Sequence, residues 1–370
     1  IVVGFKNKCE KGYSNAFIGL AHIATPEIFW KELRQRKVNG EFVEAFKGYE
    51  KLSLKAKNFT WNDTGNLQSF EKVKKTLETK KTLGEKLYVE AGKVLKFFPE
   101  KEKAFVLEKA SRRFLQLGPE NVRSAGNFLV YDWIEGQDLY REDESVWEKL
   151  LGVVFSSYSK SKCSIPENSC LSFYRDKTLA RVHSFVGRYG EKYLKESFTV
   201  NGVQYSPLES MLGCIDFGLF YRHCLGYTMF HGDLQPSNVI LSNQGRLVYI
   251  DWRDLFDKYS DRGDLYYDLG KMLGGIEVNY SDARDSSIFR FKESDYNVEY
   301  RYSYEKGENF LPTFYNILQE HGVDRHHVEL VRILVQLSMT PLHEEQYGKF
   351  LWFRSIENLS KWIQRKRLLQ

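Results

Sequence analysis

The sequence predicts an α+β protein in which a small strand-rich unit precedes a larger helical unit. The stretch "KLYVEAGKVLKFF" (86–98) alternates polar and apolar residues around "EAGK", which is typical of a β-hairpin. The stretch "NFLVYDWIEG" (127–136) indicates a buried strand that leaves into a loop. From Trp147 onward helical patterns dominate, interrupted by a hairpin-like stretch at 238–251.

The composition favours a folded protein that binds small anions. The chain has 370 residues, of which 42% are hydrophobic and 15% aromatic, enough to build more than one core. Its net charge of +5 is spread along the sequence. This balance suits a nucleotide ligand, whereas a nucleic acid would need a concentrated basic stripe.

The cysteines and the hydropathy pattern indicate a cytoplasmic protein. Five cysteines without a C-x-x-C pair favour a reducing compartment and make a zinc site unexpected. We see neither an apolar run of membrane-spanning length nor a signal peptide. The sequence begins at Ile1 within an apparent strand, so we expect it to belong to a longer protein.

A lysine-rich segment, "EKVKKTLETKKTLGEK" (71–86), suggests a boundary, although a solvated helix would have the same composition. We therefore predict three parts: 1–80, 81–136 and 137–370. In the second part, "EKEKAFVLEKASRRFLQL" (100–117) predicts a helix. Its core face would carry Phe105, Val106, Ala110, Phe114 and Leu115.

The stretch "FHGDLQPSNVILSNQGRLVYIDWRD" (230–254) contains the strongest functional signal. "NVILS" and "RLVYI" are apolar strand formers separated by "NQG", a hairpin turn. The hairpin would return Asp251 beside Asn238, and a carboxylate with an amide oxygen suits Mg²⁺. Asp233, on a loop that Pro236 keeps out of a helix, could accept a hydroxyl proton.

This stretch resembles the catalytic loop of the protein-kinase-like small-molecule phosphotransferases, the aminoglycoside phosphotransferase and choline kinase group. The family pattern HGDxxxxN, followed by a strand and IDW or IDF, matches 231–238 and 250–252. The resemblance implies a bilobal protein-kinase-like fold, with a small β-rich lobe before a large helical lobe. It also implies ATP and Mg²⁺ as cofactors, Asp233 as the catalytic base, and Asn238 and Asp251 as metal ligands.

The same resemblance implies a strand lysine for the ATP phosphates and a helix glutamate that holds it. Lys96 lies on an apolar strand, where a solvated lysine would be unexpected. Glu108 on the following helix is the candidate partner, with Glu100 and Glu102 as rivals. "VYDWIEG" (130–136) would be the hinge that meets adenine, and no GxGxxG glycine loop is present.

A second stretch, "DRGDLYYDLGKML" (261–273), resembles the GDxxYDLA segment that follows the metal loop in these enzymes. We interpret Asp264 and Asp268 as structural residues that bind loop backbone.

The first eighty residues resemble another family. "WNDTG" (61–65) looks like a turn in the late part of sugar-phosphate or choline-phosphate nucleotidyltransferases, in which the aspartate, here Asp63, can bind metal. An Asp-Thr-Gly turn is also common by itself. The glycine-rich nucleotide loop of that family is absent, so we expect a partial α/β domain that is inactive in this form.

Four residues are candidates for binding the acceptor. Arg175 and Lys177 lie in a basic stretch with Arg181 that could bind an anionic group, although a solvated helix start is the other interpretation. Arg253 directly follows the metal strand. His343 follows a helix break at Pro341, where a structural histidine would also fit.

The sequence thus predicts a kinase that phosphorylates a hydroxyl of an amino alcohol, polyol or sugar. Fusion to a nucleotidyltransferase-like segment suggests a product destined for a nucleotide-activated headgroup of a surface polysaccharide or lipid. Pathway enzymes or the missing part of that domain would be its partners. A catalytically weak scaffold and a protein-kinase-like enzyme are the alternatives, and the choice between ATP and GTP is open.

Overall fold

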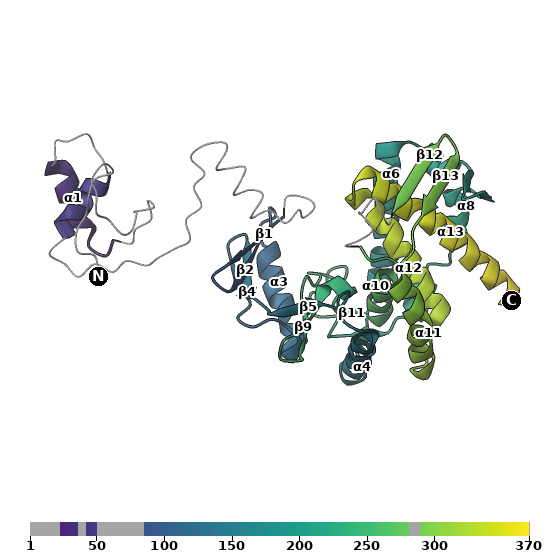
Figure 1. The fold of residues 1–370 in the computed structure, drawn as a ribbon, viewed down its shortest axis with the longest axis horizontal. Helices are drawn as coiled ribbons and strands as arrows, with labels where there is room; N and C mark the ends of the chain where they lie inside the picture. Colours follow the sequence, from purple (N-terminus) through teal and green to yellow (C-terminus); the bar gives the residue numbers. More distant parts are fainter. Residues whose placement is uncertain (1–22, 36–41, 50–84, 281–288, 370) are drawn as a thin grey trace. The chain divides into compact units, whose positions relative to one another are not determined.

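The computed structural model describes residues 23–35, 42–49, 85–280 and 289–369 (Figure 1). The chain divides into two compact units, 1–77 and 78–370. In the first, helix α1 (Pro26–Gln35) packs on the 3₁₀ segment η1 (Phe42–Tyr49) through Phe29 and Phe46, whose ring centroids are 5.5 Å apart. Asp63 and the turn around it lie outside the described residues, and the predicted boundaries at 80 and 136 stay predictions.

The second unit begins with a four-stranded antiparallel sheet in the order β1-β2-β4-β3. The predicted hairpin at 86–98 is confirmed, because β1 pairs with β2 from Lys86↔Phe97 to Glu90↔Lys93. Its two-residue turn, Ala91 and Gly92, has positive φ at both positions, as a tight hairpin requires. The strands are β1 (Lys86–Glu90), β2 (Lys93–Phe97), β3 (Arg123–Ala125) and β4 (Phe128–Asp132).

The helix after β2 has a different buried face from the one we predicted. Helix α3 (Lys103–Ser111) buries Ala104, Leu107 and Ala110, and Phe114 follows in the 3₁₀ segment η2 (Arg112–Leu117). The prediction for Phe105 was wrong, since its side chain is 59% exposed. The helix buries one stripe at i, i+3 and i+6, and Phe105 lies one residue off that stripe.

The predicted hairpin after the catalytic loop is confirmed. Strand β9 (Val239–Ser242) pairs antiparallel with β10 (Leu247–Tyr249), and Gly245 takes the positive φ of the turn. The Ile250 amide donates to the Asn238 carbonyl at 2.9 Å, which continues the pairing to the residue before Asp251. Strand β5 (Gly136–Asp138) adds to β9, so the segment that leaves β4 joins this small sheet.

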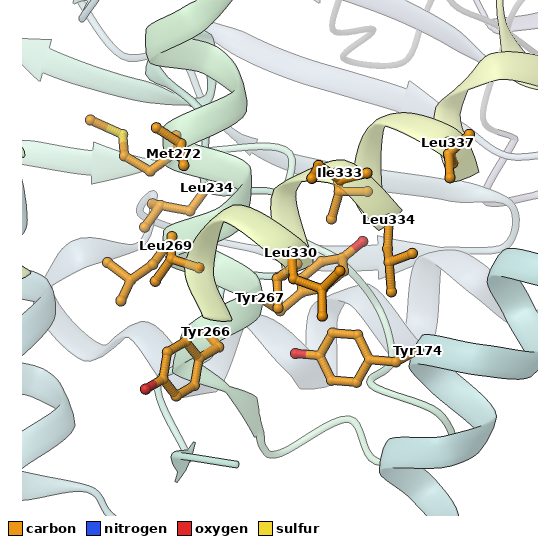
Figure 2. Packing of buried hydrophobic residues seen from close by; sticks show 14 of the residues in the cluster. Tyr174, Leu234, Tyr266, Tyr267, Leu269, Met272, Leu330, Ile333, Leu334 and Leu337 are labelled. Atoms are coloured by element: carbon orange, nitrogen blue, oxygen red, sulfur yellow. The ribbon is translucent and has the colours of Figure 1, made fainter. Parts of the chain in front are cut away.

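Helices dominate the rest of the unit. The central pair is α10 and α12, and Figure 2 shows their apolar side chains with Leu234 in the same cluster. Leu234 is 1% exposed, so the residue after Asp233 anchors this loop in the core. The helices are α4 (Glu144–Lys160), α5 (Glu167–Leu171), α6 (Lys177–Tyr189), α7 (Lys192–Lys195), α8 (Leu208–Gly213), α9 (Leu219–Arg222), α10 (Leu265–Glu277), α11 (Glu305–Glu320), α12 (Arg325–Met339) and α13 (Glu345–Leu369).

A second four-stranded sheet, in the order β12-β13-β6-β7, interrupts the helical part and was not predicted. The strands are β6 (Phe198–Val200), β7 (Val203–Tyr205), β12 (Arg290–Ser294) and β13 (Asn297–Arg301), and β8 (Gly226–Tyr227) pairs separately with β11 (Gly263–Asp264). The predicted α+β class, with a strand-rich part before a larger helical part, is confirmed. Of the helices that the structure describes, none has the length and apolarity needed to cross a membrane.

Candidate active site

Six of the predicted site residues line one cavity of about 460 Å³ in the second unit. Lys96 comes from β2, whereas Asp233, Asn238 and Asp251 come from the catalytic loop and its hairpin. Arg253 and His343 also line it, together with Asp254 and the apolar side chains Leu107 and Leu129. The structure therefore brings together the residues proposed for phosphate, metal and acceptor.

The hairpin places Asn238 and Asp251 as the sequence predicted. The Asn238 side-chain nitrogen donates to the backbone oxygen of Asp233 at 2.9 Å and to its carboxylate at 3.1 Å. The amide oxygen of Asn238 is therefore the atom left for a cation. Asp251 has φ +56°, a left-handed conformation that Asp tolerates better than most residues and that ends the strand abruptly.

Lys96 forms an ion pair with the carboxylate of Asp251. Its side chain is only 6% exposed, and its ammonium lies 5.2 Å from the centroid of the Tyr131 ring. A lysine held at this depth presents its charge to the cavity and not to solvent. This pair joins the first sheet to the β9–β10 hairpin.

The donors around Asp251 fit Mg²⁺. Asn238 and Asp251 offer one neutral and one anionic oxygen, and Mg²⁺ commonly takes one or two carboxylates, with phosphate and water oxygens completing its octahedron. Within the described ranges, no group of three or more His, Cys, Asp or Glu side chains is placed to hold a metal ion. The donor set therefore suits a cation that arrives with nucleotide phosphates.

Asp233 is held by a lysine that the sequence reasoning missed. Its carboxylate pairs with the Lys271 ammonium of α10 at 2.6 Å, and the Lys271 side chain is 7% exposed. Burial alone would raise the pKa of Asp233, but Lys271, followed by Arg253, outweighs burial and leaves the pKa lowered. Asp233 is therefore an ionised carboxylate with a fixed orientation.

His231 is neutral and structural. Burial lowers its pKa to about 3, and its Nδ1 accepts a hydrogen bond from the Asp233 amide at 3.1 Å. The ring packs beside Phe114 and Tyr249. A histidine that stays neutral across the physiological range shapes the loop but does not supply a proton.

Two buried aspartates hold this loop, as the sequence predicted. Asp268 is 0% exposed and accepts from the amides of His231 at 2.8 Å and Gly232 at 2.6 Å, and from the Tyr227 hydroxyl. Asp264 accepts from the amide of Leu225 and caps α10. Burial raises the pKa of both carboxyls to about 6, so both stay mostly ionised above neutrality.

We predict that Asp268→Asn destabilises the protein and lowers turnover together. The amide replaces one acceptor with a donor and leaves buried N–H groups of the loop unpaired, at about 1–3 kcal/mol for each such group. Urea unfolding and turnover, measured beside the exposed control Asp261→Asn, check this. A normal unfolding free energy in Asp268→Asn would remove the structural role.

The substitution should also change how stability depends on pH. The pKa of Asp268 is raised on folding, from 3.8 to about 6. The proton-linked part of its contribution to stability is therefore fully present below pH 3.8 and is lost as the pH rises through 6. Between these values, Asp268→Asn should flatten the dependence relative to Asp261→Asn.

Glu108 is not brought to Lys96. Its carboxylate accepts from the amide and hydroxyl of Ser124 at 2.8 and 2.6 Å and lies 3.7 Å from Arg112. These hydrogen bonds lower the pKa of Glu108 and tie α3 to β3. The lysine-to-helix pair that the resemblance implies is thus replaced in this structure by Lys96 with Asp251.

The remaining acceptor candidates lie apart from one another. Arg175 forms an ion pair with its neighbour Asp176 at the surface, away from the cavity. Lys177 begins α6 and contacts Phe173 and Tyr267. The break at Pro341 is confirmed by the end of α12 at Met339, and it delivers His343 to the cavity.

Two further contacts tie the segment after Asp251 to the first part of the unit. The Trp252 indole donates to the Leu107 carbonyl of α3 at 3.0 Å. The buried Arg113 guanidinium donates to the Arg253 carbonyl at 2.8 Å. Trp252 belonged to the sequence motif, whereas Arg113 lies in a stretch with no recognisable signal.

No protein-family model matches the sequence, and no curated protein matches it. Similar solved structures include LicA in complex with AMP, with 16% identity and TM-score 0.43, covering 79% of this chain and 96% of that chain. A choline kinase from Cryptosporidium parvum has 12% identity, TM-score 0.42 and coverage of 82% and 94%. An aminoglycoside phosphotransferase from Streptomyces rimosus has 17% identity, TM-score 0.40 and coverage of 75% and 96%.

Proposed function

We propose that this chain transfers the terminal phosphoryl group of ATP to a hydroxyl group of a small molecule, with Mg²⁺ as the cation. The observation that carries the proposal is the meeting of Lys96, Asp233, Asn238 and Asp251 around one cavity. A buried lysine, a neutral oxygen donor and two carboxylates are the groups that phosphoryl transfer needs, because its catalysis consists mainly of positioning and charge stabilisation.

Each residue has a distinct role in this proposal. When ATP binds, the Lys96 ammonium leaves the Asp251 carboxylate and pairs with a nucleotide phosphate. Asn238 and Asp251 then hold the cation. Asp233, which Lys271 keeps ionised and oriented, accepts a hydrogen bond from the acceptor hydroxyl and takes its proton as the oxygen attacks. Mg²⁺, when bound, neutralises charge that develops on the phosphoryl oxygens. Arg253 and His343 form the wall on the acceptor side of the cavity.

The wider setting follows from the resemblances in the sequence. The segment before residue 80 would be part of a nucleotidyltransferase-like domain, and Asp63 its metal-binding turn. The kinase product would then feed a nucleotide-activated headgroup for a surface polysaccharide or lipid, in the cytoplasm. Release of pyrophosphate from CTP with a sugar phosphate would contradict our expectation that this segment is inactive here.

ADP release in a coupled assay tests the proposed activity. We expect release from Mg·ATP to rise at least tenfold above the background when an accepted alcohol, amino alcohol or sugar is added, since the acceptor supplies the attacking oxygen. GTP in parallel establishes the nucleotide preference, and excess chelator should abolish release. Equal ADP release with and without every acceptor would favour a scaffold or a slow ATPase instead.

A further inference from the structure

A cluster of basic side chains without carboxylate partners lies beside the catalytic loop. Lys177 and Arg181 are one turn apart on α6, and Arg253 follows the metal-binding strand. In the part of the chain that the structure describes, no carboxylate forms an ion pair within 4 Å of any of these three groups. Basic residues elsewhere in the unit, such as Arg175 and Lys271, do have such partners.

Two of these cations converge on a single neutral hydroxyl. The Lys177 ammonium lies 3.4 Å from the Tyr267 hydroxyl, and the Arg253 guanidinium lies 3.3 Å from the same oxygen. The Lys177 ammonium also lies 3.4 Å from the centroid of the Phe173 ring. The aromatic contacts orient the charges, but a hydroxyl and a ring face cannot neutralise them.

The cluster is electrostatically incomplete. Burial, then repulsion from Arg253, Lys271 and Arg181, lowers the pKa of Lys177 well below its ordinary value. Asp233, the carboxylate that follows Gly232, is already paired with Lys271. All three side chains are partly withdrawn from solvent. Charges withdrawn from water are normally paired, so an array of this kind favours an anion that completes it.

The cluster adjoins the reacting position. The Arg253 guanidinium donates to the carbonyl of Gly232, the residue before Asp233, and Arg253 lines the cavity. Lys177 follows a five-residue π-helical segment, Ser172–Asp176, between α5 and α6. Such segments are rare and are frequently found at functional sites.

We propose that Lys177, Arg181 and Arg253 form a subsite for an anionic group of the phosphoryl acceptor. The acceptor is then a small hydroxyl compound that also carries a carboxylate or a phosphate. A guanidinium matches either group with two parallel hydrogen bonds, whereas a quaternary ammonium would meet like charge. This inference rests on the proposed kinase function and narrows its substrate class.

Calorimetric binding to the full chain, with Mg²⁺ and a non-hydrolysable ATP analogue present, tests the subsite. The probes are D-glycerate, which carries a carboxylate, and glycerol 3-phosphate, which carries a phosphate. Glycerol is the neutral probe and choline the cationic one. We expect at least one of the two anions to bind at least about tenfold more tightly than glycerol, because a charge-assisted hydrogen bond contributes about that much affinity. If neither anion binds more tightly than glycerol, the proposal is overturned.

Matched variants locate the binding. Lys177→Met and Arg181→Met should each weaken anion binding by about tenfold and leave the affinity for the ATP analogue unchanged. Arg188→Met, at an exposed position near the end of the same helix, should change neither. Weaker binding of the analogue, with anion binding unaltered, would assign the cluster to ATP phosphates and overturn the proposal.

The two proposals fail in different ways. Anion binding that depends on Lys177, without ADP release for any acceptor, supports the subsite and contradicts the kinase function. ADP release with choline or glycerol as the better substrate supports the kinase and overturns the anionic subsite.

Discussion

Asp233→Asn is expected to lower turnover by about 10²–10⁴, the usual contribution of a positioned general base. The amide cannot take the proton of the acceptor hydroxyl. The affinity for ATP should change little, because the proposed mechanism has Asp233 act on the acceptor and assigns the cation to Asn238 and Asp251. Turnover, ATP binding and melting temperature measured on one preparation separate chemistry from structure.

The Lys271 pair makes a sharper version of this experiment possible. Asp233→Asn leaves the buried Lys271 ammonium without its counter-charge, so the variant should also lose stability. Adding Lys271→Met removes that charge and should restore the melting temperature without restoring turnover. Asp261→Asn is the exposed control. Recovery of turnover in the double variant would show that Asp233 acts through stability and not in the reaction.

Asp251→Asn is expected to abolish nucleotide-dependent Mg²⁺ binding and with it all measurable turnover. The substitution removes the anionic oxygen donor, and no neutral amide compensates for a lost charge at a hard divalent cation. Asn is preferable to Ala here because it tolerates the left-handed backbone, φ +56°, without much strain. Mg²⁺ titration in the presence of ATP, followed by calorimetry, gives the result directly.

Asp257→Asn is the matched control for this experiment. Asp257 also has a left-handed backbone, φ +53°, but its carboxylate accepts from the Ser172 hydroxyl and does not line the cavity. It should bind Mg²⁺ as the unmodified protein does. Unchanged turnover in Asp251→Asn would exclude Asp251 from the metal site.

The parts of the site that the sequence predicted are those in which spacing alone determines geometry. A hairpin with a three-residue "NQG" connection has one register, so Asp251 had to return beside Asn238. Lys96 was predicted because a solvated lysine would be unexpected on an apolar strand. Its side chain is only 6% exposed, which agrees with that expectation. The "EAGK" turn specified the β1–β2 hairpin in the same local way.

The parts that the sequence did not give depend on tertiary contacts. Lys271 reaches Asp233 from a helix 38 positions further along the chain, and nothing in "DLGKML" marks it. Glu108 satisfied the expected spacing, but Ser124 offers it two hydrogen bonds and holds it on β3. One missed feature did have a signal: Asn201-Gly202 is a hairpin turn, and both residues have positive φ between β6 and β7.

Phosphorus NMR of the reaction mixture tests the central claim most directly. With Mg·ATP and an acceptor that stimulates ADP release, the terminal phosphoryl signal should disappear as ADP and a new phosphate-monoester resonance appear in equal amounts. The same mixture with Asp233→Asn should show neither product on that timescale. Inorganic phosphate in place of the monoester, or no loss of the terminal phosphoryl signal at all, would contradict the assignment of this chain as a small-molecule kinase.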